Sequence, residues 1–198
     1  MPVTPDHVRA SATELRHTLA PVIDAEWTIR AADLDWSVWD TGVHVADDLV
    51  FYAAQLIAQP IDRAGYTPFE VAMWGGSEGG ADNDGLVRTI EVCAEILARV
   101  VTTAGPDDRG FHTYGVSDAE GFAAMGVVET LVHAYDMSQA FGLARRPPGE
   151  LSAVVLERLF PDAPDGDPTD VLLWCCGRTA LGARPRQTVW QWDGGVRR

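Results

Sequence analysis

Apolar side chains recur every three or four positions in four stretches of the chain, which is the spacing of a helix that buries one face. The stretches cover about residues 4–23, 43–57, 86–103 and 119–142. Pro60 ends the second stretch, because proline cannot continue a helix. The pattern therefore predicts four long helices.

The segments between and after these stretches have weaker patterns. Residues 107–118 are predicted to form a polar connection, residues 150–160 and 167–180 two short helices, and residues 189–192 a short extended or irregular segment. The glycine-rich run at 75–80 lacks the Lys-Ser or Lys-Thr pair of a phosphate-binding loop, so a linker or lid is the favoured interpretation. We expect one all-α domain over 1–198, with a bundle at about 4–143 and an appendage at about 144–198.

The fourth stretch carries three polar residues on one helical face. Glu129, His133 and Asp136 follow an ExxxHxxD spacing, which puts the first two about one turn (roughly 6 Å) apart. A carboxylate and an imidazole on one face can supply two ligands to a divalent metal ion, and Asp136 can accept the free ring N–H of His133. The best candidate for a third ligand is His44, in the second predicted helix.

Simpler interpretations of the same residues stay open. A Glu and a His four residues apart often form only a side-chain pair, and a lone His such as His44 is more often a satisfied, partly buried side chain. His112 could carry a proton or act as an extra ligand, although a solvated loop histidine is the simpler interpretation. Asp47 and Asp48 are either hydrogen-bond acceptors for His44 or exposed carboxylates.

Composition narrows the functional classes. The 198 residues are 46% hydrophobic, so the chain should fold despite its net charge of −14, and this acidity argues against nucleic-acid binding. All basic side chains are Arg, which excludes a Schiff-base lysine. Three cysteines fit no disulfide framework, and of the adjacent Cys175 and Cys176 we expect one to point inward and the other outward. With no leader-like segment and no apolar run of roughly 18 residues, the sequence predicts a soluble cytoplasmic protein without a membrane partner.

Several motifs together resemble the DinB-like superfamily and, within it, the mycothiol-dependent maleylpyruvate isomerase N-terminal-domain group. The matching segments are WSVWD at 36–40, VHVA at 43–46, GFAAM at 121–125, ETLVHAYD at 129–136 and LLWCCGR at 172–178. Their order and spacing span most of the chain, which makes the combination more specific than any one motif.

The resemblance implies a four-helix bundle in which His44, Glu129 and His133 bind a divalent metal, usually zinc. Asp136, from its spacing, is then the residue that orients His133. Nickel is an alternative metal for these ligands. The implied activity is that of a transferase or isomerase that activates a low-molecular-weight thiol such as mycothiol for attack on an electrophilic substrate. The isomerase continues into a further C-terminal domain, whereas this sequence ends soon after Trp192, so we do not expect maleylpyruvate isomerisation itself.

Two other functions remain open beside this enzyme. The first is a non-catalytic metal- or ligand-binding bundle with a stress-related or unknown role. The second is a bundle in which His44, Glu129 and His133 form only a buried hydrogen-bonded cluster. Whether two copies pair into a homodimer is also open.

Overall fold

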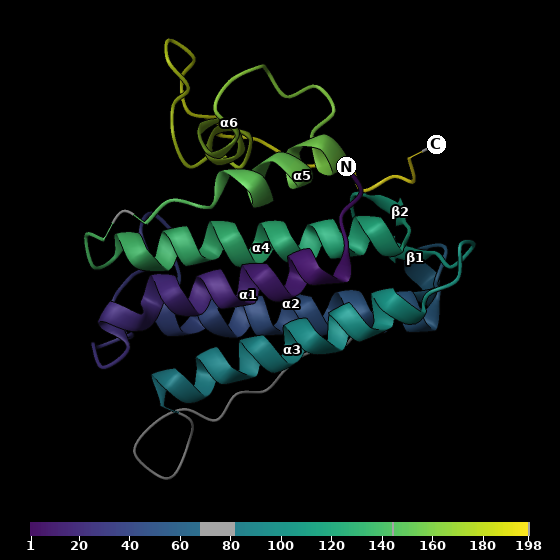
Figure 1. Cartoon of the computed structure of the whole chain (residues 1–198), viewed down its shortest axis with the longest axis horizontal. Coiled ribbons are helices and arrows are strands. Elements are labelled where there is room, and N and C mark those ends of the chain that lie inside the picture. The colour runs from purple at the N-terminus through teal and green to yellow at the C-terminus, as the bar shows by residue number, and fades with distance from the viewer. Residues whose placement is uncertain (68–81, 144, 198) are drawn as a thin grey trace.

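The structure is a computed structural model, which describes residues 1–67, 82–143 and 145–197. Over these residues the chain is mostly helical with one small sheet (Figure 1). The helices are α1 (Pro5–Leu19), α2 (Val38–Ala58), α3 (Asn83–Thr103), α4 (Ala119–Gln139), α5 (Gly149–Leu159) and α6 (Pro168–Cys175), with short 3-10 turns η1 (Ala20–Val22) and η2 (Arg63–Gly65). The strands are β1 (Gly110–His112) and β2 (Gly115–Ser117).

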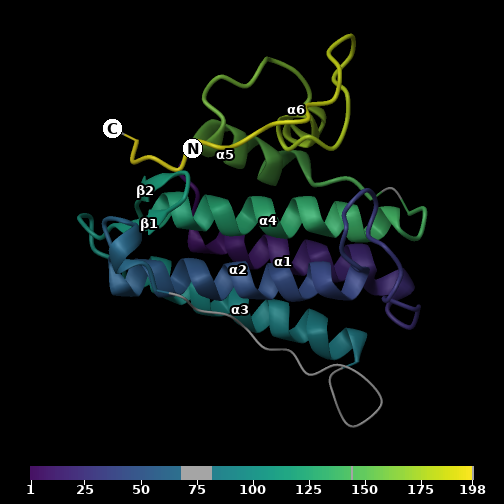
Figure 2. The same cartoon turned by 180° about the vertical axis from the view of Figure 1, so that it is seen from behind.

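The four long helices lie side by side along the long axis of the molecule (Figures 1 and 2). Helix α1 packs against α3 and α4, and α2 packs against the same two helices from the other side. The apolar stripes predicted from the sequence meet between them, with Leu15, Leu49, Leu97 and Leu131 among the side chains buried there. These contacts form the hydrophobic core.

Helix α4 is covered on more sides than the other long helices. Helix α5 packs on the side of α4 that faces away from α2, and α6 packs in turn on α5 (Figure 2). As a result, 16 of the 21 residues of α4 are buried. Polar side chains on this helix therefore face protein interior or a cavity rather than open solvent. The packing is also tight at Gly126, where a Cβ would lie 2.6 Å from a methyl carbon of Leu97.

Side-chain caps fix where the helices that carry the polar residues begin. Ser37 Oγ accepts a hydrogen bond from the backbone N–H of Asp40, and the Asp40 carboxylate returns the contact to Ser37. Asp118 caps α4 in the same way by accepting the N–H of Gly121. Each cap of this type stabilises its helix by about 1 kcal/mol.

The connection before α4 differs from the prediction. The segment 107–118 contains the two-stranded antiparallel hairpin of β1 and β2, in which Phe111 pairs with Val116. The expected all-α fold therefore becomes a mostly helical fold with one hairpin. Strands of three residues are too short to show an alternating pattern in the sequence.

The C-terminal part contains the two predicted short helices, of which α5 has the predicted length and α6 is shorter. Helix α6 ends at Cys175 rather than near residue 180, because Gly177 adopts the left-handed backbone (φ +66°) that breaks a helix. Cys175 and Cys176 are both buried, so the prediction that one points outward is wrong. The glycine-rich run at 75–80 lies outside the described residues.

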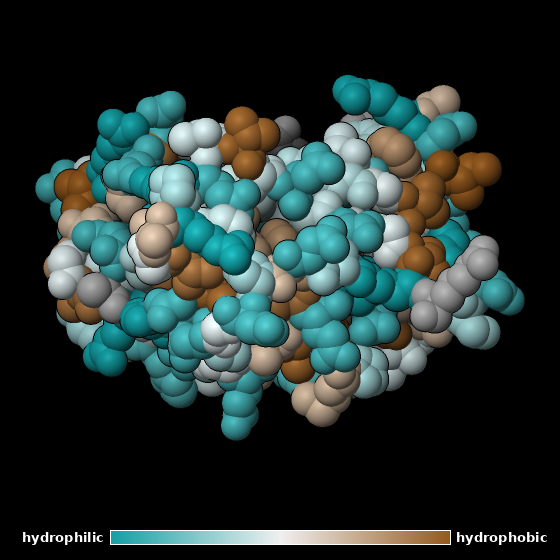
Figure 3. Space-filling view, turned by 90° about the horizontal axis from the view of Figure 1, so that it is seen from above, coloured by the Kyte–Doolittle hydropathy of each residue, from teal (hydrophilic) through white to brown (hydrophobic). Residues whose placement is uncertain are grey.

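The surface on the side of α5 and α6 is largely hydrophilic, with hydrophobic side chains in small separate groups (Figure 3). In the described part of the chain, none of the helices combines the length and the apolar character needed to span a lipid bilayer.

Candidate metal centre

Two neighbouring helices bring His44, Glu129 and His133 together. His44 lies on α2, and Glu129 and His133 lie one turn apart on α4, which packs against α2. One ligand atom of each side chain lies within 4.8 Å of the corresponding atoms of the other two. The structure thus places the three residues as the sequence predicted, although they come from segments some 85 positions apart.

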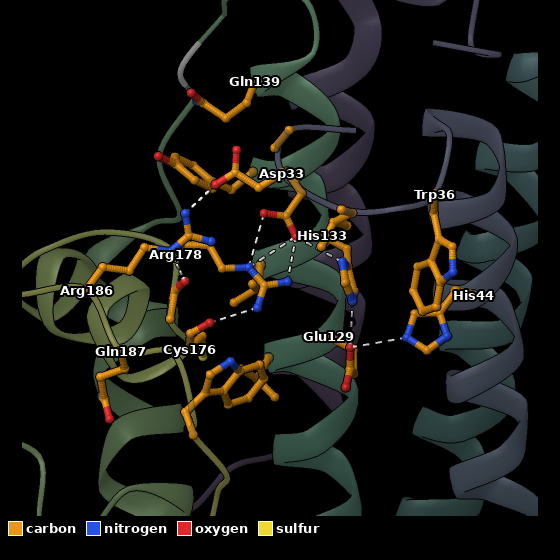
Figure 4. A pocket seen from close by; sticks show the side chains of 18 of the residues that line it. Asp33, Trp36, His44, Glu129, His133, Gln139, Cys176, Arg178, Arg186 and Gln187 are labelled. Atoms are coloured by element: carbon orange, nitrogen blue, oxygen red, sulfur yellow. Dashed lines mark hydrogen bonds and ion pairs between the residues drawn. The ribbon is translucent and has the colours of Figure 1, made fainter. Parts of the chain in front are cut away.

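The Glu129 carboxylate stands between the two imidazoles (Figure 4). Its Oε2 atom lies 3.1 Å from Nε2 of His133 and 3.8 Å from Nε2 of His44. Ligand atoms around a tetrahedral zinc ion lie about 3.4 Å apart, given metal–ligand distances of about 2.1 Å. The nitrogen and oxygen donors of this cluster therefore fit a divalent ion after small side-chain shifts.

A fourth side chain of the cluster is Asp48, one turn after His44 on α2. Its Oδ2 atom lies 3.2 Å from Nε2 of His44. Burial raises the pKa of Asp48 well above its usual value, and the negative charge of Glu129 raises it further. The interpretation of Asp48 as an exposed helix carboxylate is therefore wrong, because the side chain is only 19% exposed.

The cluster places several carboxylates where they repel one another. Burial alone would raise the pKa of Glu129, but the hydrogen bond and charge of His133 and the charge of His44 outweigh burial and lower it. Burial lowers the pKa of His44, which favours the neutral imidazole whose nitrogen can donate a lone pair to a metal ion. A cation among these groups would relieve the repulsion, which is a second reason why the residues fit a metal ion.

His133 is oriented from its other side by Asp136. Nδ1 of His133 lies 3.0 Å from Oδ2 of Asp136, and Arg178 holds the same carboxylate. Hydrogen bonds to Asp136 and Glu129 outweigh the effect of burial and raise the pKa of His133 to about 9. The predicted contact of Asp136 with His133 is present, whereas Arg178 was not foreseen.

The three candidate ligands line a cavity of about 920 Å³. Trp36 packs its ring 4.7 Å from the ring of His44 at one wall (Figure 4). The opposite wall comes from the segment after α6 and includes Arg178, Arg186 and Trp190. The Nε2 atom of Gln139, another lining residue, is buried and has no hydrogen-bond partner in the described part of the chain.

His112 lies apart from this group. It is buried in the β1–β2 hairpin, with its ring stacked on Trp192 at 5.8 Å and its Nδ1 accepting the backbone N–H of Tyr114. Burial lowers its pKa to about 4. It does not line the cavity, and the interpretation as a solvated loop histidine is wrong. A role for His112 as proton carrier or extra ligand stays a prediction.

Comparison with known proteins identifies one relationship. The family model described as the mycothiol maleylpyruvate isomerase N-terminal domain matches residues 8–138, which is about two thirds of the chain. The matched region contains all three candidate ligands and ends just after Asp136. Comparisons with curated proteins and with solved structures gave no match.

Proposed function

We propose, from the premise that this chain belongs to the mycothiol maleylpyruvate isomerase N-terminal domain family, that it is a metal-dependent enzyme using a low-molecular-weight thiol. In this proposal the thiol is mycothiol or a similar molecule, and it is transferred to, or used to isomerise, a small electrophilic substrate. The single observation that carries the proposal is the convergence of His44, Glu129 and His133 at the wall of a large cavity.

The residues that would hold a divalent ion are His44, Glu129 and His133, whose Nε2, Oε2 and Nε2 atoms face one another. Three protein ligands are typical of catalytic rather than structural zinc sites. A divalent ion bound there lowers the pKa of a thiol and favours the reactive thiolate. Zinc is the expected metal and nickel the alternative, because imidazole and carboxylate donors suit both.

The remaining residues of the cavity bind and orient the thiol and its partner. Asp48 lies behind the cavity wall, with its Oδ2 atom 3.2 Å from Nε2 of His44, the proposed ligand atom, so this carboxyl group can help to attract the same cation. Gln139 offers an unused amide donor to a polar group of the thiol. The Trp36 and Trp190 rings give apolar surface on opposite sides of the opening and exclude water from the carbon that reacts.

The proposal extends to the architecture and location of the chain. We take α1 to α4 as a DinB-like four-helix bundle within one domain of residues 1–198, and α5, α6 and the final segment as an appendage that completes the cavity wall. A cytoplasmic location is part of the proposal, and the three free, buried cysteines are compatible with reducing surroundings.

Metal content is the first test. Wild-type protein, purified without added metal and then equilibrated with zinc and dialysed, should retain about one zinc per chain. The variant His133→Ala should lose it because one of three ligands is missing, whereas His17→Ala, which alters an exposed histidine of α1, should retain it. Equal zinc in all three proteins, or none in the wild type, would contradict the metal centre and favour the buried hydrogen-bonded cluster.

Thiol chemistry is the second test. Zinc-loaded wild type should accelerate the reaction of mycothiol with a chromogenic aryl chloride, and the His133→Ala protein should not. If the wild type holds zinc but neither binds mycothiol nor accelerates the reaction, the non-catalytic metal- or ligand-binding bundle becomes the better conclusion.

A further inference from the structure

We propose that Arg178 is a positioning residue of the metal centre, which acts through Asp136 to orient His133. The inference rests on the proposed function, because it assigns a role in holding the metal that is proposed there. It also makes the segment after α6 part of the metal centre, although that segment lies beyond the residues 8–138 that the family model matches.

Arg178 donates hydrogen bonds to both carboxylate oxygens of Asp136. Its Nη2 donates to Oδ2 of Asp136 at 2.7 Å, and its Nε donates to Oδ1 at 3.1 Å (Figure 4). A guanidinium that contacts both oxygens fixes the plane of the carboxylate as well as its position. The Asp136 side chain is 3% exposed and that of Arg178 11%, so solvent does little to weaken the pair.

The fixed carboxylate in turn determines which nitrogen of His133 carries the proton. Both oxygens of Asp136 accept hydrogen bonds from the guanidinium of Arg178, as a carboxylate does, and Oδ2 also faces Nδ1 of His133. An ionised carboxylate only accepts hydrogen bonds, so the proton must lie on Nδ1 of His133, 3.0 Å away. Nε2 is then the nitrogen left for a metal ion, which would take its lone pair on the side of Glu129 in place of a proton.

Arg178 is itself held by the local structure of the C-terminal segment. Its Nη1 donates to the carbonyl oxygen of Cys176 at 2.7 Å, and its guanidinium lies over the ring of Trp190 at 5.5 Å. Gly177 turns the chain with φ +66°, and a Cβ there would come within 2.7 Å of the Trp190 ring. The tight turn after α6 therefore directs Arg178 back toward α4.

The test is a zinc titration of metal-free full-length protein in competition with a chelator dye. Arg178→Met removes the guanidinium but keeps an apolar stem against Trp190, and we expect zinc to bind about 10 to 100-fold more weakly. Arg184→Met is the matched control, because it removes a guanidinium that lies 5.6 Å from the ring of Trp174 in the same segment. The control should bind zinc as the wild type does.

A double-mutant comparison separates positioning from a general structural effect. If Arg178 acts through Asp136, then adding Arg178→Met to Asp136→Asn should change the zinc affinity by no more than about 2-fold. A merely structural role would give a further full loss in the double variant. Arg178→Lys, which keeps the charge but cannot contact both oxygens in one plane, should also bind zinc more weakly than the wild type.

The outcomes distinguish this inference from the proposed function. Wild-type affinity in Arg178→Met, or in Arg178→Lys where the methionine variant does not fold, would overturn the positioning role while the metal centre stands. Additive losses in the double variant would overturn it as well. Failure of the wild type to bind zinc would overturn the proposed metal centre and with it the role of Arg178.

Discussion

His133 and His112 are buried to nearly the same degree, with 6% and 8% of their surface exposed, but their surroundings are opposite. His133 lies between the carboxylates of Glu129 and Asp136. The ring of His112 lies within 6.5 Å, centroid to centroid, of four aromatic rings, those of Phe51, Tyr52, Tyr114 and Trp192. Comparing the two histidines therefore shows how polar neighbours change the pKa of an imidazole at nearly equal burial.

The difference in neighbours reverses the shift in pKa. Burial lowers the pKa of His112 to about 4, because a charged ring is costly among apolar groups. Burial acts on His133 in the same direction, but the hydrogen bonds to Asp136 and Glu129 overcome it and raise its pKa to about 9. Surroundings that stabilise a protonated imidazole also stabilise a metal cation, so the comparison favours the region around His133 over that around His112 for the proposed metal centre.

The largest expected effect is on zinc affinity. Glu129→Gln removes the charge of the proposed ligand that stands between the two imidazoles, so zinc should bind more weakly by more than the roughly 100-fold that loss of an outer partner costs. His112→Asn should bind zinc as the wild type does. Competition titrations against a chelator dye measure both affinities.

The same two variants can also contradict the distinction between His133 and His112. An equal loss of zinc in His112→Asn would make that histidine part of the centre and would support the prediction of an extra ligand. Thermal melting of both metal-free proteins is the control, because a variant that has lost its fold says nothing about ligands.

The next effect is on the pH dependence of stability. His112 has a folded-state pKa of about 4, below the value of 6.5 expected in the unfolded chain. As the pH falls below 6.5 the unfolded state takes up the proton first, so wild-type stability falls until about pH 4 and no further from this source. The total loss is about 3 kcal/mol, since one pKa unit corresponds to about 1.4 kcal/mol.

Urea unfolding of metal-free wild type and His112→Asn at a series of pH values checks this. The asparagine oxygen can still accept the Tyr114 N–H, so the variant should fold, and its stability should depend less on pH between 6.5 and 4. Parallel curves for the two proteins would mean that His112 does not titrate as its buried surroundings require.

The sequence predicted the parts of this comparison that depend on local spacing. The four long helices followed from apolar periodicity, and the one-turn step from Glu129 to His133 requires only helical geometry. His44 was found by residue type and by the family resemblance rather than by spacing. No local pattern in the sequence shows that α2 and α4 are neighbours. The contact between His44 and Glu129 could therefore be seen only in the folded structure.

The parts that the sequence did not predict depend on contacts between distant segments. Asp48 reads as a surface carboxylate on a helix, and only the packing of α2 against α4 buries it beside Glu129. Arg178 lies 42 positions after Asp136, with a turn at Gly177 deciding its direction. The burial of His112 depends on a hairpin too short for a periodic signal.

The smallest expected effect on stability comes from an exposed ion pair, which we compare with the buried charged groups around His133. Glu95 on α3 accepts hydrogen bonds from Arg9 and Arg99, each at 2.7 Å, and these lower its pKa to about 2. Its contribution to stability is therefore present above about pH 4.5, the value of the unfolded chain, and is lost as the pH falls toward 2. Solvent and salt screen such a pair, unlike the buried carboxylates around His133.

Glu95→Gln should thus lower the melting temperature at pH 7 by no more than about 2 °C, and 1 M NaCl should remove most of the difference. Glu14→Gln, at a partly exposed position on α1 that has no ion pair among the described residues, is the matched control for loss of one charge. Circular dichroism melts at pH 7 and pH 2 provide the measurement. Glu95→Gln could instead lose as much stability at pH 7 as the wild type is expected to lose through His112 on acidification. The ion pair between α1 and α3 would then behave like a buried one, and exposure to solvent would not weaken it.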